Sequence, residues 1–467
     1  MGRGRDLLTA GLLALLAGCA RERPGLEPRH VLLLTVGHLR ADRCSFLLHE
    51  RPTTWLPSDE LMRSEHRAFS FDDLAAEGVV FAHCYAPSPV LEVSLAALLA
   101  GRPPLETGVL RAGEPLPGEL VTLAEAFRAG GFQTAAFVAG DPPLEPSFGA
   151  GFARFETHAS DAQALAAMAR HLGRDPGSGA RHFTWVHLAG LAPPWSATEA
   201  LPEILGERDF GLDGDAGPVD GSTASLRALN DGAVAAKTAD REALRALYDR
   251  RLARLSAEAW LGLHAAFDFH TGAAEASETW ARTVFVLAGL NGIELLDRGA
   301  VGTEGLLSEA VLHVPLVLRH PDSLTGERIL AEIVGLEDVA PTLLDWLGLP
   351  PLPGARGRSL LALTDSYVQR PFPPRPAFAQ LPDRAVFSAR DARFRLVWNP
   401  TGARPAGRPA AAGPLAAVEL FDLAADPRGV RDASASHPEA VARLSAEIRA
   451  WRESLGARPA ARPPATR

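Results

Sequence analysis

Short apolar runs, each ended by a turn or by polar residues, recur along the chain from residue 30 to about residue 350. Runs of this kind are typical of strands that are buried on both faces of a parallel sheet. The predicted strands cover residues 31–36, 79–85, 134–138, 182–188, 283–288 and 314–319. Helical patterns lie between them at residues 71–77, 94–99 (with Ser94 as the cap), 123–129 and 339–347. This alternation predicts an α/β fold with a mostly parallel central sheet flanked by helices.

The pattern changes after residue 357, where shorter segments predict a small C-terminal α+β subdomain with an antiparallel sheet. Its strands are expected at residues 385–388, 393–398 and 418–423, followed by a closing helix whose apolar face holds Val441, Leu444, Ile448 and Trp451. Two polar stretches, 45–67 and 195–232, are predicted to be surface excursions near the carboxyl edge of the sheet. The predicted units are a main domain over 30–365, a subdomain over 366–455 and a disordered tail over 456–467.

The N-terminal residues predict an export signal. Two arginines precede the apolar run from Leu7 to Leu16, which is too short to span a bilayer. The run ends in Leu-Ala-Gly-Cys, which resembles a bacterial lipoprotein signal with cleavage before Cys19. This resemblance implies a signal peptide over 1–18, lipidation of Cys19 and a tether over 19–29. Because Ala20 follows, it also implies an outer-membrane anchor facing the periplasm. The alternative is an ordinary signal peptide whose cysteine is incidental.

The charge of the chain narrows its possible partners, and its cysteines leave open whether a disulfide forms. The net charge of −9 over 467 residues argues against a nucleic-acid surface, which would need a basic face. Cys44 and Cys84 are the other two cysteines. Export would permit a disulfide between them, but two buried free thiols are an equally good interpretation.

Ten short landmarks follow one another in a characteristic order. They are LRAD (39–42), YAPSP (85–89), SLAALLAGRPP (94–104), GFQTAAFV (131–138), WVHL (185–188), ALYD (246–249), HVPLVLRHP (313–321), DVAPTLLDWLGLP (338–350), GRSL (357–360) and LFDLAADP (420–427). Together they resemble the sulfatase family of the alkaline phosphatase superfamily, from residue 30 to about residue 453. The resemblance implies the sandwich fold of that superfamily and sulfuric ester hydrolysis, which needs a divalent cation, an activated nucleophile and cationic groups around the sulfate.

The positions that carry this chemistry in the family hold other residues here. By the resemblance, the acidic pair at the first strand end falls on Gly37 and His38, and the acid and its neighbour at the second fall on Leu290 and Asn291. The nucleophile falls on Leu91, the downstream cation on Thr303 and a further histidine near Ala192. Leucine has no nucleophilic atom, and glycine has no ligand. The sequence therefore predicts that the metal and nucleophile positions are vacated.

A few polar residues near these positions remain as candidates. His38, Arg40 and Asn291 are the predicted residual pocket. Arg40 could bind an anion, but a structural ion pair with Asp42 is the preferred interpretation. His187 is expected to be a hydrogen-bonded core histidine. Two carboxylates that follow the vacated metal loop, Glu294 and Asp297, are expected to be solvated.

These observations favour a membrane-anchored, sulfatase-like pseudoenzyme that binds a ligand or a partner protein, and no cofactor is expected. One alternative is an active sulfatase or phosphoryl hydrolase that holds Ca or Mg through His38, Asn291 and Asp42. Another is a scaffold for an active homologue.

Overall fold

The computed structural model describes residues 28–456 with internal gaps. The gaps are 48, 50–52, 55–69, 141–142, 174–178, 199–200, 202–204, 206–209, 211–218, 268–278, 322–327, 365–369, 382–385, 403 and 406. The predicted signal peptide, Cys19 and most of the tether therefore lie outside the described residues, as do nearly all of the tail and most of the 45–67 excursion. Within the described part, no helix is both long and apolar enough to cross a membrane.

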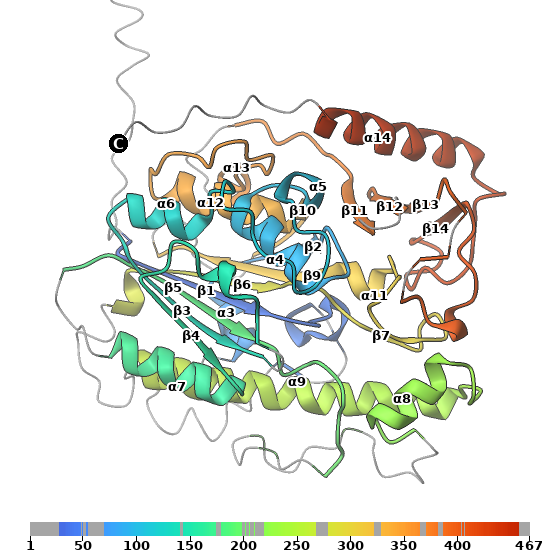
Figure 1. Ribbon diagram of the computed structural model, residues 1–467, viewed down its shortest axis with the longest axis horizontal. Coiled ribbons are helices and arrows are strands. Elements are labelled where there is room, and N and C mark those ends of the chain that lie inside the picture. The colour runs from blue at the N-terminus through green and yellow to red at the C-terminus, as the bar shows by residue number, and fades with distance from the viewer. Residues whose placement is uncertain are drawn as a thin grey trace, which may run out of the picture.

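An eight-stranded sheet forms the centre of the molecule (Figure 1), with strand order β10-β2-β9-β6-β1-β5-β3-β4. The strands are β1 (His30–Val36), β2 (Val79–Tyr85), β3 (Gln133–Ala139), β4 (Arg154–His158), β5 (His182–Leu188), β6 (Thr283–Gly289), β9 (His313–Arg319) and β10 (Arg328–Gly335). Only β9 runs antiparallel to its neighbours within this sheet. The predicted mostly parallel sheet is thus confirmed, and β4 and β10 are strands that the apolar pattern did not predict.

The apolar runs become strands because both faces of the sheet are covered. Alternate side chains of β1 enter two different cores: Leu32 and Leu34 enter one, and Val31 and Leu33 enter the other. Figure 1 shows α7 (Asp161–Leu172) and α9 (Thr238–Phe267) beneath the sheet, with α4 (Leu91–Ala100), α6 (Leu123–Ala129) and α12 (Val339–Trp346) above it. The remaining helices are α3 (Phe71–Ala76), α5 (Pro104–Thr107), α8 (Thr223–Asn230), α11 (Glu309–Leu312), α13 (Leu361–Thr364) and α14 (Pro438–Gly456).

Two expectations about helices and loops were wrong. α4 begins at Leu91 after the residue Val90, and Ser94 is not its cap, because the Ser94 hydroxyl donates to the Ser88 carbonyl (2.8 Å) from inside the helix. The second polar stretch is also not wholly a surface excursion. Its apolar residues enter the core on the α9 side of the sheet, and α8 forms at its end; these buried residues are Trp195, Leu205, Phe210, Val219, Leu226 and Leu229.

The two remaining cysteines are free and buried. Cys44 packs in the core on the α9 side of the sheet, whereas Cys84 packs in the core on the α4 side. The sheet therefore separates the two thiols, and no disulfide joins them.

A second, antiparallel sheet follows the central one, as predicted, with strand order β11-β12-β13-β14. Its strands are β11 (Ala377–Leu381), β12 (Val386–Arg390), β13 (Phe394–Trp398) and β14 (Val418–Asp422). The closing helix is α14, and it buries Leu444 and Ile448 against this sheet. The first of these strands, β11, was not predicted. The domain boundary at residue 365 stays a prediction.

A half-buried ionic junction joins the segment before β11 to the start of α12. Arg375 contacts Asp338 (2.6 Å) and Glu337 (3.5 Å). Burial and the neighbouring Asp338 raise the pKa of Glu337 to about 7. One arginine thus serves two carboxylates, and Asp338 holds the shorter contact.

Glu337→Gln is expected to change how stability depends on pH. Because the pKa of Glu337 is raised in the folded state, folding is favoured at low pH. This contribution is lost as pH rises from about 4.5 to about 7. The variant should therefore be more stable than the parent at pH 8, by about 3 kcal/mol, and equal to it near pH 4. Urea unfolding across this range checks the prediction, with the exposed Glu332→Gln as the control.

Candidate functional site

Three of the predicted vacated segments meet at the carboxyl edge of the central sheet. Gly37 follows β1, Leu91 begins α4 and Leu290 follows β6. The Leu290 amide donates to the Val36 carbonyl (2.9 Å). A Cβ atom placed on Gly37 would lie 2.6 Å from Cδ1 of Leu91. The half-buried Leu91 side chain thus occupies the space into which a side chain at position 37 would extend.

Thr303 is not part of these contacts. It follows the short hairpin of β7 (Glu294–Leu295) and β8 (Val301–Gly302), and it is half-buried. Its carbonyl accepts a hydrogen bond from the Leu306 amide (3.3 Å). The predicted cation position therefore belongs to a separate loop.

Asn291 joins the strand ends through the oxygen and the nitrogen of its buried side-chain amide. Its Oδ1 accepts from the His38 amide (2.9 Å), and its Nδ2 donates to the Pro89 carbonyl (2.9 Å). The adjoining turn is unusual because the backbone φ of His38 is +60°, and residues other than glycine seldom adopt such an angle. The hydroxyl of Tyr248 holds this turn, since it donates to the His38 carbonyl (2.7 Å) and accepts from the Arg40 amide (3.1 Å).

Asn291→Ala is expected to lower the free energy of unfolding by about 2–4 kcal/mol, because a buried amide and a buried carbonyl lose their partners together. Asn291→Asp keeps the acceptor for His38 but cannot donate to Pro89, so it should also destabilise the chain. Urea unfolding followed by tryptophan fluorescence measures both losses. A parent chain that gains stability on addition of Ca or Mg, and loses this gain with Asn291→Ala, would instead mark Asn291 as a metal ligand.

The two imidazoles at this edge are neutral at physiological pH. Burial lowers the pKa of His38 to about 4, and burial together with His38 lowers the pKa of His187 to about 4. His187 is a buried strand residue whose Nδ1 is hydrogen-bonded to Oγ1 of Thr35 (2.9 Å). It is therefore the hydrogen-bonded core histidine that the sequence predicts.

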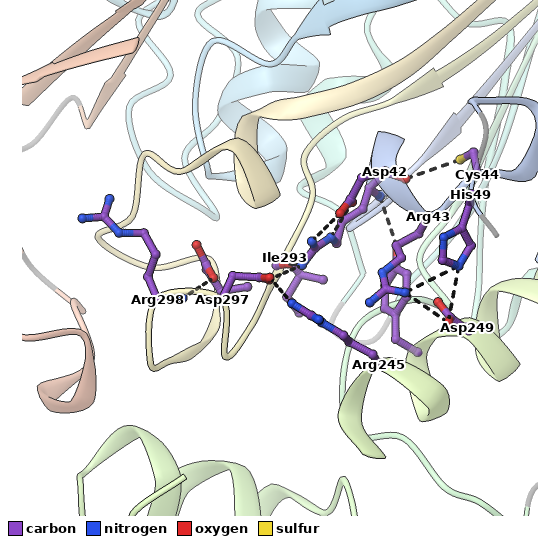
Figure 2. Close-up of polar contacts among 12 residues, drawn as sticks. Asp42, Arg43, Cys44, His49, Arg245, Asp249, Ile293, Asp297 and Arg298 are labelled. Carbon is purple, nitrogen blue, oxygen red and sulfur yellow. Dashed lines mark hydrogen bonds and ion pairs between the residues drawn. The ribbon is translucent and has the colours of Figure 1, made fainter. Parts of the chain in front are cut away.

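Arg40 makes a structural ion network, and Figure 2 labels its partners Asp42, Ile293 and Asp297. The Nε and Nη2 of Arg40 donate to the two carboxylate oxygens of Asp42 (2.8 and 2.7 Å). Its Nη1 donates to Oδ2 of Asp297 (2.7 Å) and to the Ile293 carbonyl (3.0 Å). Arg245 of α9 contacts the other oxygen of Asp297. Since every guanidinium nitrogen of Arg40 has an acceptor, the ion-pair interpretation holds and Arg40 has no free edge for an anion.

The expectation that Glu294 and Asp297 are solvated was wrong, because both are buried. Burial would raise the pKa of Asp297, but Arg40 and Arg245 hold it below its usual value. Burial and the nearby Asp297 raise the pKa of Glu294. The reason is tertiary: the hairpin of β7 and β8 folds this loop inward, against the arginines.

The donor set at the strand ends does not fit the hard divalent cation that the resemblance implies. Ca²⁺ and Mg²⁺ prefer several oxygen ligands, with carboxylates among them. Here the side chains of Gly37 and Leu290 offer no metal ligand. The side-chain oxygen and nitrogen of Asn291 are both already hydrogen-bonded within the protein. Across the described ranges, no group of three or more His, Cys, Asp or Glu residues is placed to hold a metal ion.

Comparisons with known proteins identify the fold. No family model and no curated protein matches this sequence. Among solved structures, the phosphonate monoester hydrolase of Agrobacterium radiobacter is 19% identical, with 92% of this chain and 96% of that chain covered and a TM-score of 0.66. The phosphonate monoester hydrolase of Silicibacter pomeroyi is 18% identical, with 91% and 95% covered and a TM-score of 0.63. A 2-O GAG sulfatase is 14% identical, with 92% and 93% covered and a TM-score of 0.65.

The chain therefore has the fold of these phosphonate monoester hydrolases and of this sulfatase. Sequence reasoning placed the strand-end positions of that fold but assigned no role to Tyr248 or Arg245. Tyr248 lies within the landmark ALYD, and that landmark was the available signal for it.

Proposed function

We propose that this chain is a sulfatase-like protein that no longer hydrolyses esters and that acts by binding a ligand or a partner protein. The observation that carries the proposal is that the Leu91 side chain fills the space beside Gly37. By the resemblance, Leu91 stands at the nucleophile position and Gly37 at a metal position, and the Leu91 side chain occupies the space of a side chain at position 37. Loss of a metal ligand or of a nucleophile normally lowers turnover by several powers of ten.

The test uses the purified chain with chromogenic sulfate, phosphate and phosphonate esters. Each ester is assayed with added Ca, Mg, Mn or Zn and with a chelator, and bound metal is measured by elemental analysis. An active sulfatase prepared in the same way is the positive control. We expect no turnover above the blank and metal well below one equivalent. Metal-dependent turnover that Asp42→Asn or Asn291→Ala abolishes would establish the alternative, an active hydrolase with unusual ligands.

The proposed location is the bacterial cell envelope, through a lipid on Cys19. Support comes from the Leu-Ala-Gly-Cys sequence that ends a short apolar run. Cys19→Ala should move the full chain from the membrane pellet to the soluble fraction and abolish labelling by a radioactive fatty acid. Cys44→Ala is the matched control, because that thiol is buried. Unchanged labelling of the Cys19 variant would contradict the proposal.

A further inference from the structure

Two buried arginines face each other across the second sheet. Arg390 ends β12 and Arg395 lies in β13, and the two are register partners in the antiparallel pair. They are 7% and 1% exposed. Directly opposed residues extend on the same face of a sheet, and like charges in such a pair repel. The arrangement therefore needs compensation by negative charge.

Glu309 of α11 supplies only part of that compensation. Its Oε1 lies 3.4 Å from Nη1 of Arg395 and 4.0 Å from Nε of Arg390. The hydroxyl of Tyr85 also donates to this carboxylate (3.3 Å). A third arginine, Arg298, is nearby but has its own partner, Glu419 (2.9 Å). Two buried guanidinium groups thus share one carboxylate, and an isolated buried charge is costly.

Several guanidinium donors of the pair are also unused. Within the part of the chain that the structure describes, the buried Nε of Arg390 and the buried Nε and Nη2 of Arg395 have no hydrogen-bond partner. Arg408 offers a contrast in the same region, because it is 7% exposed and donates to the carbonyls of Gly305, Ala412 and Gly413. Buried donors are normally paired, so unused ones on two neighbouring arginines point to a missing acceptor.

Aromatic rings accompany both guanidinium groups. The guanidinium carbon of Arg390 lies 5.2 Å from the centre of the Tyr85 ring, and that of Arg395 lies 5.1 Å from the centre of the Phe421 ring. Rings in these positions hold the arginine side chains by cation–π attraction but accept no conventional hydrogen bond. Nη1 of Arg390 donates to the Asp391 carbonyl, and Nη1 of Arg395 donates to Glu309. The unpaired nitrogens of the two arginines therefore remain available for an acceptor with several oxygens.

We propose that Arg390 and Arg395 form a binding site for a compact oxyanion, the phosphate, sulfate or carboxylate group of a ligand. Paired guanidinium donors match the geometry of such groups, and the anion would supply both the missing charge and the missing acceptors. α11 lies between the central sheet and the second sheet (Figure 1), so the site is at their junction. The inference rests on the proposed binding role, and none of its residues belongs to the vacated positions.

The test is thermal unfolding of the full chain in a low-salt buffer with phosphate, sulfate or acetate, each matched in ionic strength by sodium chloride. We expect a saturable rise in Tm of a few degrees with at least one of the three anions and none with chloride. The anion that acts identifies the ligand group. Equal responses to all four salts would overturn the site, whereas the ester assays would still decide the hydrolysis question.

Variants separate a binding site from a structural ion pair. Arg395→Met should weaken half-saturation at least tenfold, yet leave the anion-free Tm unchanged or higher, because Arg390 then pairs alone with Glu309. A structural pair would instead lose Tm without anion and keep the response. Arg390→Met provides the same readout if the first variant fails to fold. Arg393→Met is the matched control, since Arg393 is exposed and pairs with Asp422 (2.6 Å); its anion response should equal that of the parent.

Discussion

Gly37→Asp is expected to destabilise the chain by about 2–4 kcal/mol and to create no metal-dependent stability. The new Cβ would lie 2.6 Å from Cδ1 of Leu91, so one of the two side chains must move. Overpacking of this kind typically costs about 1–3 kcal/mol. The added carboxylate would also lie in a largely buried position beside neutral groups, without a cation to pair with.

A double-mutant cycle isolates the steric part of this effect. Gly37→Ala should cost about 1–3 kcal/mol alone, and much less in a Leu91→Ala background, because the alanine leaves room for the new methyl group. Urea unfolding is measured for each chain with a chelator and again with Ca or Mg. If Gly37→Asp were harmless, or if either cation stabilised it, the carboxyl edge would have room for a carboxylate at position 37, and the interpretation that Leu91 fills this space would be wrong.

The strands of the central sheet were predictable because burial on both faces leaves a continuous apolar signature. β2 and β5 begin and end at the predicted residues, and β1 differs by one residue. The long helix α9 left no such signature. It buries Leu244 and Leu252, but also Tyr248 and Asp249, so polar and apolar residues alternate around its circumference. Tertiary contacts, rather than local pattern, define that helix.

The candidate site was also predictable only in part. Its strand-end positions follow from topology, because parallel strands bring their carboxyl ends to one edge. Side-chain occupancy does not follow from topology: the sequence places Leu91 at a vacated position but cannot show that its side chain fills the space beside Gly37. Nor does local sequence reveal the burial of Asp297, whose partner Arg40 lies 257 residues earlier. Solvation was the reasonable expectation for a loop carboxylate, and only the fold supplies its cations.

Asp297→Ala is expected to lower the free energy of unfolding by about 3–5 kcal/mol, the range typical for removal of one partner from a buried ionic group. Asp297 is bound by both Arg40 and Arg245, so its loss leaves the half-buried Arg245 without this carboxylate and the buried Arg40 with Asp42 as its remaining ion-pair partner. Asp42→Ala is the matched control. Its side chain is 55% exposed, and Arg40 would keep Asp297 and the Ile293 carbonyl, so a loss below about 1 kcal/mol is expected.

The same network should also set part of the acid sensitivity of the fold. Although burial acts in the opposite direction, Arg40 and Arg245 hold the pKa of Asp297 below its usual value of 3.8. Its contribution is therefore complete above that usual pKa and is lost as pH falls through the lower pKa of the folded state. Asp297→Asn should be less stable than the parent at pH 7, and the difference should shrink toward pH 2. Urea unfolding at several pH values measures this slope, and a constant difference between the two chains would show that Asp297 is not ionised in the folded protein.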